Sequence, residues 1–206
     1  MAKIVPFREG IGEALKVLRS GGAIAYPTET VYGLGADPWD RNAVERIYRI
    51  KGRPKEKRFL LVVSDVGMLK GLVGEVPNAA EALMRRFWPG PLTLVLRAGP
   101  EAPPWCGETV AVRAPGHPGV RELVARFGKA LISTSANRSS EPPARTAGEV
   151  AERLGEEVDL ILDGGLCSGL PSTIVDLSGE SPRILRRGDI KEEDIAPFLA
   201  DYHPKR

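Results

Sequence analysis

Apolar residues recur along the chain at two spacings, one typical of helices and the other of strands. Between residues 11 and 18 they fall three or four positions apart, which places them on one face of a helix that Gly21 and Gly22 end. The same spacing predicts helices over residues 40–50, 79–87, 118–127, 147–154 and 191–199. Short apolar or alternating runs predict strands at residues 4–5, 23–26, 59–63, 92–96, 109–113, 130–133, 160–162, 173–177 and 183–185.

These elements alternate without a regular strand–helix–strand repeat, and no linker divides the chain. We therefore predict one α/β domain built on a mixed sheet. Asp40 is placed to cap the helix over residues 40–50, and a short helix is predicted to begin at Ser64 or Asp65. After the strand at residues 23–26, we expect the chain to turn sharply where hydroxyl and β-branched residues run into Gly33 and Gly35.

Composition narrows the class of protein. The chain has 206 residues, of which 42% are hydrophobic and 27% charged, enough for a sizeable core. Its formal net charge of +2 is too balanced to indicate a nucleic-acid-binding protein. No apolar run is long enough for a signal peptide or a membrane span, so we predict a cytoplasmic protein without membrane attachment. Cys106 and Cys167 lack metal-ligand spacing and are predicted to be reduced.

Residues 51–57 carry four cations in seven positions, directly after a predicted helix that Gly52 and Pro54 prevent from continuing. One interpretation is a stiff loop that binds a polyanion such as a nucleotide triphosphate. The other is a solvated turn, and charge alone favours this second interpretation because most charge runs face water.

Three clusters of small polar residues at strand ends change that balance. They lie at residues 28–32, 133–137 and 171–173. Each alone could be a turn in which side chains bond their own backbone. Together with the cations near strand ends, they favour a shared anion site, since ligands of α/β sheets commonly bind there. These cations are Arg53, Lys57, Arg113, Arg145 and Arg186.

Several common catalytic patterns are missing from the sequence. It contains no phosphate-binding loop of the GxxxxGK[ST] type and no GxGxxG turn. Of the two histidines, His117 is predicted to enter a helix and His203 lies near the chain end. No Ser-His-Asp or Cys-His arrangement is evident. We therefore expect cations and hydroxyl groups to orient anions, without a tuned acid–base pair.

Six motifs occur in an order that closely resembles the YrdC/Sua5 family of threonylcarbamoyl-AMP synthases. They are YPTETVYGLG (26–35), KGRP (51–54), WPGPLT (88–93), VRAPGHP (112–118), STSAN (133–137) and PSTIVD (171–176). The resemblance implies a single domain over residues 1–206, with a core from about residue 11 to 190. Its fold would be a twisted mixed β-sheet flanked by helices around a positively charged cavity. Longer relatives carry a second domain, so the short form is expected here.

The resemblance also implies an activity. Members of this family join L-threonine, bicarbonate or CO2 and ATP into threonylcarbamoyl-AMP and release pyrophosphate. The product serves the threonylcarbamoyl modification (t6A) of adenosine 37 in tRNAs that read codons starting with A, so a downstream threonylcarbamoyl transferase is an expected partner. Mg2+ would bind through the ATP phosphates, with no metal ligand from protein side chains. Weak binding of tRNA or other RNA is also allowed.

Residue roles follow from the resemblance, motif by motif. Three residues match contacts to L-threonine: Thr30, Arg113 and Ser172. Nine match contacts to ATP: Lys51, Arg53, Lys57, Thr109, Ser133, Ser135, Asn137, Arg145 and Arg186. No catalytic acid or base is implied, and Lys51, Arg53 and Arg113 would act through position and charge. The chain departs from the family pattern at residues 58–59, where many relatives have Pro-Leu, and at residues 62–63, where some have a histidine.

Two other functions fit parts of the sequence. An RNA-binding module could hold tRNA or double-stranded RNA in the cationic cavity without catalysis, but the modest charge and the lack of aromatic residues among the basic ones speak against it. A carbamoyl transferase acting on carbamoyl-phosphate could include a related domain. The absence of companion domains and of zinc-type cysteine motifs argues against that function.

Overall fold

Ten strands form one mixed sheet in the computed structural model, which describes residues 1–200 and 202. In chain order they are β1 (Lys3–Pro6), β2 (Ile24–Tyr26), β3 (Gly33–Gly35), β4 (Leu60–Val62), β5 (Leu92–Arg97), β6 (Thr109–Arg113), β7 (Leu131–Ser135), β8 (Leu160–Asp163), β9 (Thr173–Asp176) and β10 (Arg183–Arg186). Across the sheet their order is β1-β8-β2-β3-β7-β4-β6-β5-β9-β10. The sheet combines parallel pairs such as β1 and β8 with antiparallel pairs such as β3 and β7, which confirms the predicted mixed α/β fold.

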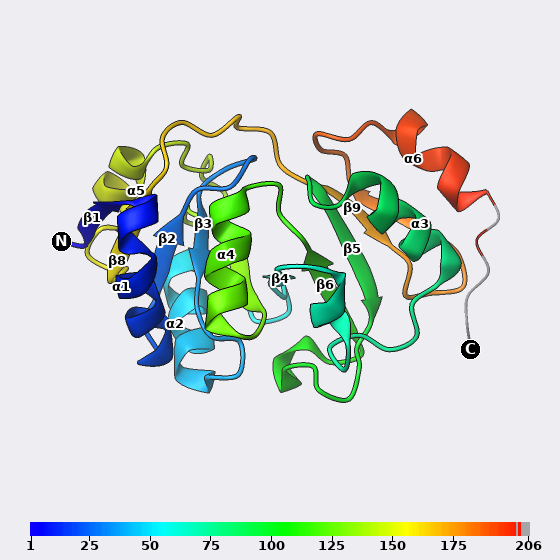
Figure 1. The fold of residues 1–206 in the computed structure, drawn as a ribbon, viewed down its shortest axis with the longest axis horizontal. Helices are drawn as coiled ribbons and strands as arrows, with labels where there is room; N and C mark the ends of the chain where they lie inside the picture. The colour runs from blue at the N-terminus through cyan, green and yellow to red at the C-terminus, as the bar shows by residue number, and fades with distance from the viewer. Residues whose placement is uncertain (201, 203–206) are drawn as a thin grey trace.

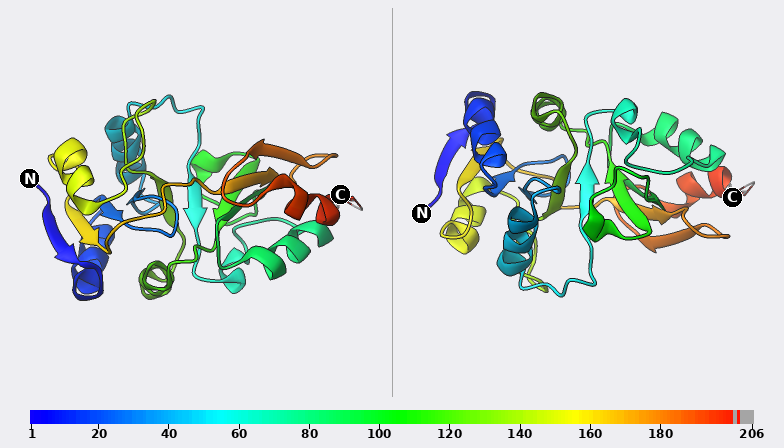
Figure 2. Two further views of the ribbon diagram at one scale, coloured as in Figure 1. Left: turned by 90° about the horizontal axis from the view of Figure 1, so that it is seen from above. Right: turned by 90° about the horizontal axis from the view of Figure 1, so that it is seen from below.

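Helices pack around this sheet in two groups (Figure 1). The helices are α1 (Phe7–Arg19), α2 (Arg41–Lys51), α3 (Asn78–Phe87), α4 (Pro118–Phe127), α5 (Ala147–Leu154) and α6 (Glu192–Leu199). Figure 1 shows α1, α2, α4 and α5 around one half of the sheet and α3 and α6 beside the other half. Figure 2 shows β4 between the two halves, preceded by a segment that extends outward from the body after α2.

Local signals in the sequence place the helix ends correctly. The Asp40 carboxylate caps α2 by accepting hydrogen bonds from the backbone N–H groups of Asn42 and Ala43. Gly52 ends the same helix with a φ of 54°, a left-handed conformation that suits glycine. The His117 ring caps α4 by accepting from the N–H of Val120, so its predicted place at a helix entry is confirmed.

The sharp turn expected after β2 is present, but it precedes the two glycines. Gly33 and Gly35 lie in strand β3, and the chain turns before them, where the Thr28 hydroxyl donates to the carbonyl of Val31. A Cβ atom on Gly35 would lie 2.7 Å from the Tyr26 ring on β2. The glycines therefore make room for a neighbouring strand's side chain. The short helix predicted after residue 64 is a 3-10 helix at Val66–Leu69.

One face of the sheet is covered along most of its width. Leu34 of β3, Ile132 of β7 and Leu94 of β5 belong to one buried cluster. That cluster also contains apolar residues of α2, α3 and α5, together with Ile195 of α6. The larger buried cluster of the protein thus lies between this face and those four helices.

The opposite face is covered by helices over only part of the described sheet. Leu60 of β4 pairs with Ser133 of β7 and with Ala111 of β6, and Ala111 pairs with Val95 of β5, so these side chains share a face. Leu131 lies two residues before Ser133, on the same face, and packs in a cluster with α1 and α4. Over β6, β5 and β9 this face lines a cavity instead.

Four remaining expectations concern single residues or the whole chain. Cys106 and Cys167 are free, as predicted, and both are buried. His203 lies outside the described residues. None of the helices in the described part of the chain combines the length and the apolar character needed to cross a bilayer. The extent of the domain, residues 1–206 with a core over about 11–190, stays a prediction.

Candidate active site

A cavity of about 350 Å3 lies on the sheet face that α1 and α4 leave free. Strands β4, β5, β6, β7, β9 and β10 contribute to its wall, together with the segment between β2 and β3 and the segment after α2. Eight of the twelve predicted site residues line it: Thr30, Arg53, Thr109, Arg113, Ser133, Ser135, Ser172 and Arg186. The predicted alternation of β6 holds, since Thr109, Ala111 and Arg113 all face the cavity.

Arg113 is a buried cation held from three sides. Its Nε donates to the carbonyl of Gly90 at 3.1 Å, and its Nη1 donates to the Thr30 hydroxyl at 3.3 Å. Its Nη2 lies 2.5 Å from Oε1 of Glu29, forming an ion pair. A guanidinium carries about five N–H donors, so these contacts fix its plane while leaving donors for a ligand.

Glu29 is the carboxylate that orients Arg113. Burial by itself would raise the pKa of Glu29, but the charge of Arg113 and a 2.7 Å hydrogen bond from the Gly116 N–H outweigh it and lower that pKa. Glu29 is therefore ionised near neutral pH. Its position between Thr28 and Thr30 in the sequence gave no sign that it would pair with a residue on β6.

A second arginine lies on the far side of the cavity. Arg186 of β10 donates through Nε to the carbonyl of Ser172 and through Nη2 to its hydroxyl, each at 2.9 Å. The Ser172 and Thr93 hydroxyls lie 2.8 Å apart. Arg113 and Arg186 both line the cavity. Burial and then the charge of Arg113 lower the pKa of Arg186.

Lys51 begins the run of cations at residues 51–57, which we call the cationic segment, but it does not line the cavity. Its ammonium is buried and donates to the Ser135 carbonyl at 2.6 Å and to Oδ1 of Asn137 at 3.0 Å. The Asn137 amide in turn donates to the carbonyls of Arg138 and Glu141. Burial, followed by the charge of Arg53, lowers the pKa of Lys51 to about 8. Lys51 and Asn137 therefore shape the end of β7 and the loop that follows it.

The rest of the cationic segment divides between the cavity and solvent. Arg53 lines the cavity, donates to the carbonyl of Arg58 at 2.7 Å and lies over the Phe59 ring. Arg58 also lines the cavity and approaches the Thr109 hydroxyl at 3.5 Å. Lys57, by contrast, is exposed. Arg53 thus faces the cavity and Lys57 faces solvent, while binding of a polyanion by residues 51–57 stays a prediction.

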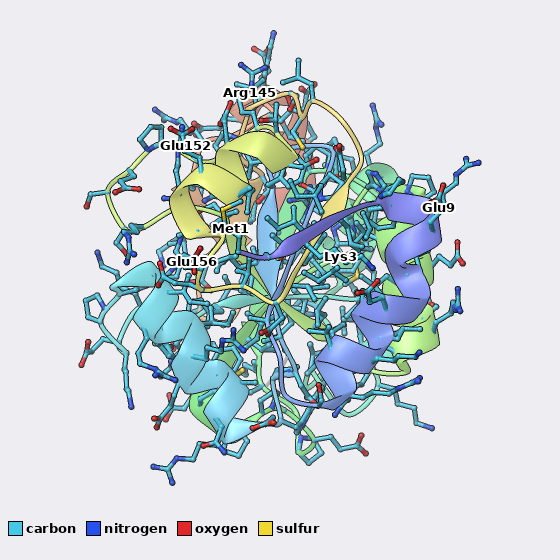
Figure 3. All side chains as sticks on the ribbon, turned by 90° about the vertical axis from the view of Figure 1, so that its left-hand side faces the viewer. Met1, Lys3, Glu9, Arg145, Glu152 and Glu156 are labelled. Atoms are coloured by element: carbon cyan, nitrogen blue, oxygen red, sulfur yellow. The ribbon has the colours of Figure 1, made fainter. Side chains whose placement is uncertain are left out.

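Arg145 lies at the outer edge of the molecule. Figure 3 shows it at the periphery, close to α5. Its guanidinium donates to the carbonyl of Cys167 through Nε at 3.3 Å and Nη2 at 3.2 Å. These bonds tie the loop before α5 to the loop after β8. A contact between Arg145 and a nucleotide stays a prediction.

Polar atoms without partners gather around this cavity. In the part of the chain that the structure describes, three buried side-chain atoms lack a polar partner: Tyr26 Oη, Glu29 Oε2 and Arg53 Nε. A fourth, Arg113 Nη2, makes its ion pair with Glu29 but no hydrogen bond of good geometry. Arg53 and Arg113 line the cavity, Glu29 contacts Arg113, and Tyr26 lies against the cavity-lining Gly33. Folded proteins leave few such atoms, since each costs about 1–3 kcal/mol. Their concentration here indicates a binding site for a polar ligand.

The charge pattern of the lining favours an anion. The lining includes four arginines, and no carboxylate among the described residues. Small hydroxyl groups of threonine and serine fill the space between them and can donate to a carboxylate or phosphate without crowding it. The net positive charge of the cavity stays a prediction. Sequence reasoning missed Arg58 and Thr93 in the lining, and only the unusual Arg58-Phe59 pair pointed to the first.

Known proteins resemble this chain over most of its length. A family model named for Sua5, YciO and YrdC, described as telomere recombination, matches residues 16–188. A threonylcarbamoyl-AMP synthase of Bacillus subtilis is 39% identical over 198 residues, which cover 94% of this chain and 57% of that protein. A threonylcarbamoyl-AMP synthase of Halorhodospira halophila is 40% identical over 88% of this chain and 95% of that protein.

A solved structure shows the same fold. The crystal structure of Pyrococcus abyssi Sua5 complexed with L-threonine superposes with a TM-score of 0.92 at 37% identity, covering 98% of this chain and 62% of that one. The chain thus spans less than two thirds of the B. subtilis and P. abyssi proteins, but nearly all of the H. halophila protein. The matched region contains every cavity residue from Thr28 to Arg186. On sequence and fold together, the chain belongs to the Sua5/YciO/YrdC family.

Proposed function

We propose that this protein is a threonylcarbamoyl-AMP synthase that holds L-threonine and ATP together in the cavity. The observation that supports this most directly is the group of unpartnered buried polar atoms around a space lined by guanidinium and hydroxyl groups. Relatives with this name match the chain over most of its length, one of them over 95% of its own length. The P. abyssi Sua5 structure, a complex with L-threonine, has the same fold.

L-Threonine is assigned to the part of the cavity around Arg113. A guanidinium fork matches a carboxylate bidentately, and Arg113 is already oriented by Glu29 and Gly90. Thr30 and Ser172 place hydroxyl groups beside Arg113 and Arg186 respectively. Threonine must be held by its carboxylate, because its amine has to remain free to become a carbamate.

ATP is assigned to the part of the cavity that β7 and the cationic segment border. Ser133 and Ser135 line it from β7, and Arg53 lines it from the segment after α2. Charge-assisted hydrogen bonds from these groups suit phosphate oxygens. Lys51 and Asn137 contribute by fixing the end of β7. Nucleotide contacts by Lys57 and Arg145 would require these side chains to leave the positions they occupy here.

The reaction fits these groups. The threonine amine attacks CO2, forming a C–N bond and releasing a proton, and an oxygen of the resulting carbamate attacks the α-phosphate of ATP. The new O–P bond forms as the bond to the β-phosphate oxygen breaks, and pyrophosphate leaves with that electron pair. A carbamate is already an anionic nucleophile, so no strong general base is needed at this step. Cations and hydroxyls instead bring the anions together and stabilise the charge of the transition state.

Mg2+ and the remaining partners complete the proposal. Within the described residues, no group of three or more His, Cys, Asp or Glu could hold a metal, and the cavity lining contains no carboxylate. Because the residues offer no ligand set of their own, Mg2+ would enter with the nucleotide, and we assign it no step. The use of bicarbonate, transfer of the product to a t6A-forming transferase, weak tRNA binding and a cytoplasmic location stay predictions.

One experiment tests the proposed reaction. The purified protein is incubated with ATP, Mg2+, labelled bicarbonate and single amino acids, and aminoacyl-carbamoyl adenylates and pyrophosphate are measured. We expect product only with L-threonine, in equal amount to pyrophosphate. Pyrophosphate release that is unchanged when threonine is omitted would refute the proposal. Salt-sensitive RNA binding without any adenylate would favour the RNA-binding alternative instead.

A further inference from the structure

Tyr26 is a fully buried residue whose ring and hydroxyl have different surroundings. It lies on β2, pairs with Gly33 of β3 and has 0% of its surface exposed. Its ring packs in the cluster that α1 and α4 form with β2 and β8. Gly35 leaves space for the ring, because an added Cβ there would lie 2.7 Å from it. A phenylalanine ring would occupy this part of the core equally well.

The hydroxyl end of Tyr26 points to the border of the cavity. A Cβ added to Gly33 would lie 3.2 Å from the Ser133 Oγ and 3.4 Å from Cζ of Tyr26, so both groups meet over this glycine. Gly33 and Ser133 themselves line the cavity. The hydroxyl end of Tyr26 therefore lies beside two residues of the cavity wall, Gly33 and Ser133.

The Tyr26 hydroxyl is exceptional among the tyrosines of this protein. The chain contains four, and the hydroxyls of the other three donate to backbone carbonyls: Tyr32 to Gly165, Tyr48 to Lys55 and Tyr202 to Leu177. The Tyr26 hydroxyl makes no hydrogen bond of good geometry. The Ser133 hydroxyl is nevertheless close enough to lower the pKa of Tyr26, against the larger effect of burial. An unpartnered buried hydroxyl destabilises the free protein. Its presence is explained if it acquires a partner when ligand binds.

We propose that Tyr26 is a positioning residue that acts through Ser133. With ligand bound, the Tyr26 hydroxyl donates a hydrogen bond to Ser133 Oγ, and Ser133 then turns its own O–H toward an anionic oxygen of the nucleotide. A serine hydroxyl rotates freely, so accepting one hydrogen bond on one side commits its proton to the other. This inference rests on the proposed function of the cavity. Burial raises the pKa of Tyr26, which keeps the hydroxyl protonated as a donor.

The test compares Tyr26→Phe, Ser133→Ala and the double variant by calorimetric titration with ATP and by thermal melting. We expect Tyr26→Phe to weaken ATP binding roughly tenfold, the effect of losing about one oriented hydrogen bond. Its melting temperature should stay equal or rise, because the hydroxyl that is removed had no partner. In the Ser133→Ala background the same change should have no further effect on ATP affinity.

Tyr32→Phe is the matched control, since Tyr32 is also fully buried but its hydroxyl is already hydrogen-bonded. It should lower the melting temperature and leave ATP affinity unchanged. An unchanged ATP affinity in Tyr26→Phe, or an equal loss with and without Ser133, would overturn the inference. A wild-type protein that does not bind ATP would refute the proposed function, and this inference with it.

Discussion

Replacing Arg113 by lysine separates the proposed role of this residue from a purely structural one. The guanidinium makes three contacts with the protein, to Gly90, Thr30 and Glu29, and the proposal adds a fourth to the threonine carboxylate. Lysine keeps the positive charge, but its ammonium group cannot present two parallel N–H donors to one carboxylate as a guanidinium does. It can retain the ion pair with Glu29 or approach the ligand, but it cannot make both sets of contacts.

The expected magnitude follows from the hydrogen bonds that a lysine at this position cannot make. A hydrogen bond to a charged group contributes about 1.5–3 kcal/mol, and each 1.4 kcal/mol is a tenfold change in affinity. Loss of one arm of the fork should therefore weaken L-threonine binding by roughly 10- to 150-fold. ATP binding should change little, because Ser133, Ser135 and Arg53 remain. The variant should also be somewhat less stable, because the carbonyl of Gly90 loses a buried donor.

The assay is titration calorimetry with L-threonine and with ATP separately, well below the melting temperature, with thermal melting measured in parallel. Arg121→Lys is the matched control. Arg121 also bonds backbone carbonyls, those of Pro115 at 2.7 Å and Gly116 at 2.9 Å, but does not line the cavity. It should lose stability without losing affinity for threonine.

Two results would refute the proposed contact between Arg113 and the threonine carboxylate. If Arg113→Lys lowers the melting temperature as Arg121→Lys does, yet binds L-threonine as tightly as the wild type, then Arg113 is only the buried partner of Glu29. Equal weakening of threonine and ATP binding would likewise contradict a carboxylate-specific role.

Two further predictions concern the cationic segment. Arg53→Ala should weaken ATP binding by roughly tenfold or more through loss of a charge-assisted bond, with the melting temperature nearly unchanged; calorimetry showing wild-type affinity in a folded variant would count against the nucleotide assignment. The pKa of Lys51 is lowered from 10.5 to about 8, so the unfolded chain binds more protons than the folded protein between these pH values. The free energy of unfolding of the wild type should therefore rise relative to that of Lys51→Met as the pH increases from about 8 to 10.5. Urea denaturation measures both free energies, and a difference between them that does not change with pH would contradict the burial of the Lys51 charge.

Features fixed by neighbouring residues were predictable from the sequence. The end of α2 follows from Asp40 and Gly52, whose effects on the backbone are local. The position of His117 at the start of α4 follows equally from the turn and proline around it. The common face of Thr109 and Arg113 needed only the period of two in a strand.

Features that depend on distant partners were not predictable in the same way. Lys51 belongs to a charge run that suggested solvent, yet acceptors on Ser135 and Asn137 make its burial tolerable. The ion pair between Glu29 and Arg113 joins two segments that only the sheet brings together. The expectation for Gly33 rested on the local preference of glycine for turns. In the structure, side chains of neighbouring strands occupy the space that a Cβ atom on Gly33 would need.

The sheet face that α1 and α4 leave free has a consequence for how the protein tolerates change. A sheet of this kind normally has a layer of protein on each side, and here small molecules would complete the missing layer over β6, β5 and β9. On the proposed function, bound substrates would pack against these strands as a layer of protein does elsewhere on the sheet. Selection for stability alone would fill that space with apolar side chains, so stability and activity oppose each other at these positions.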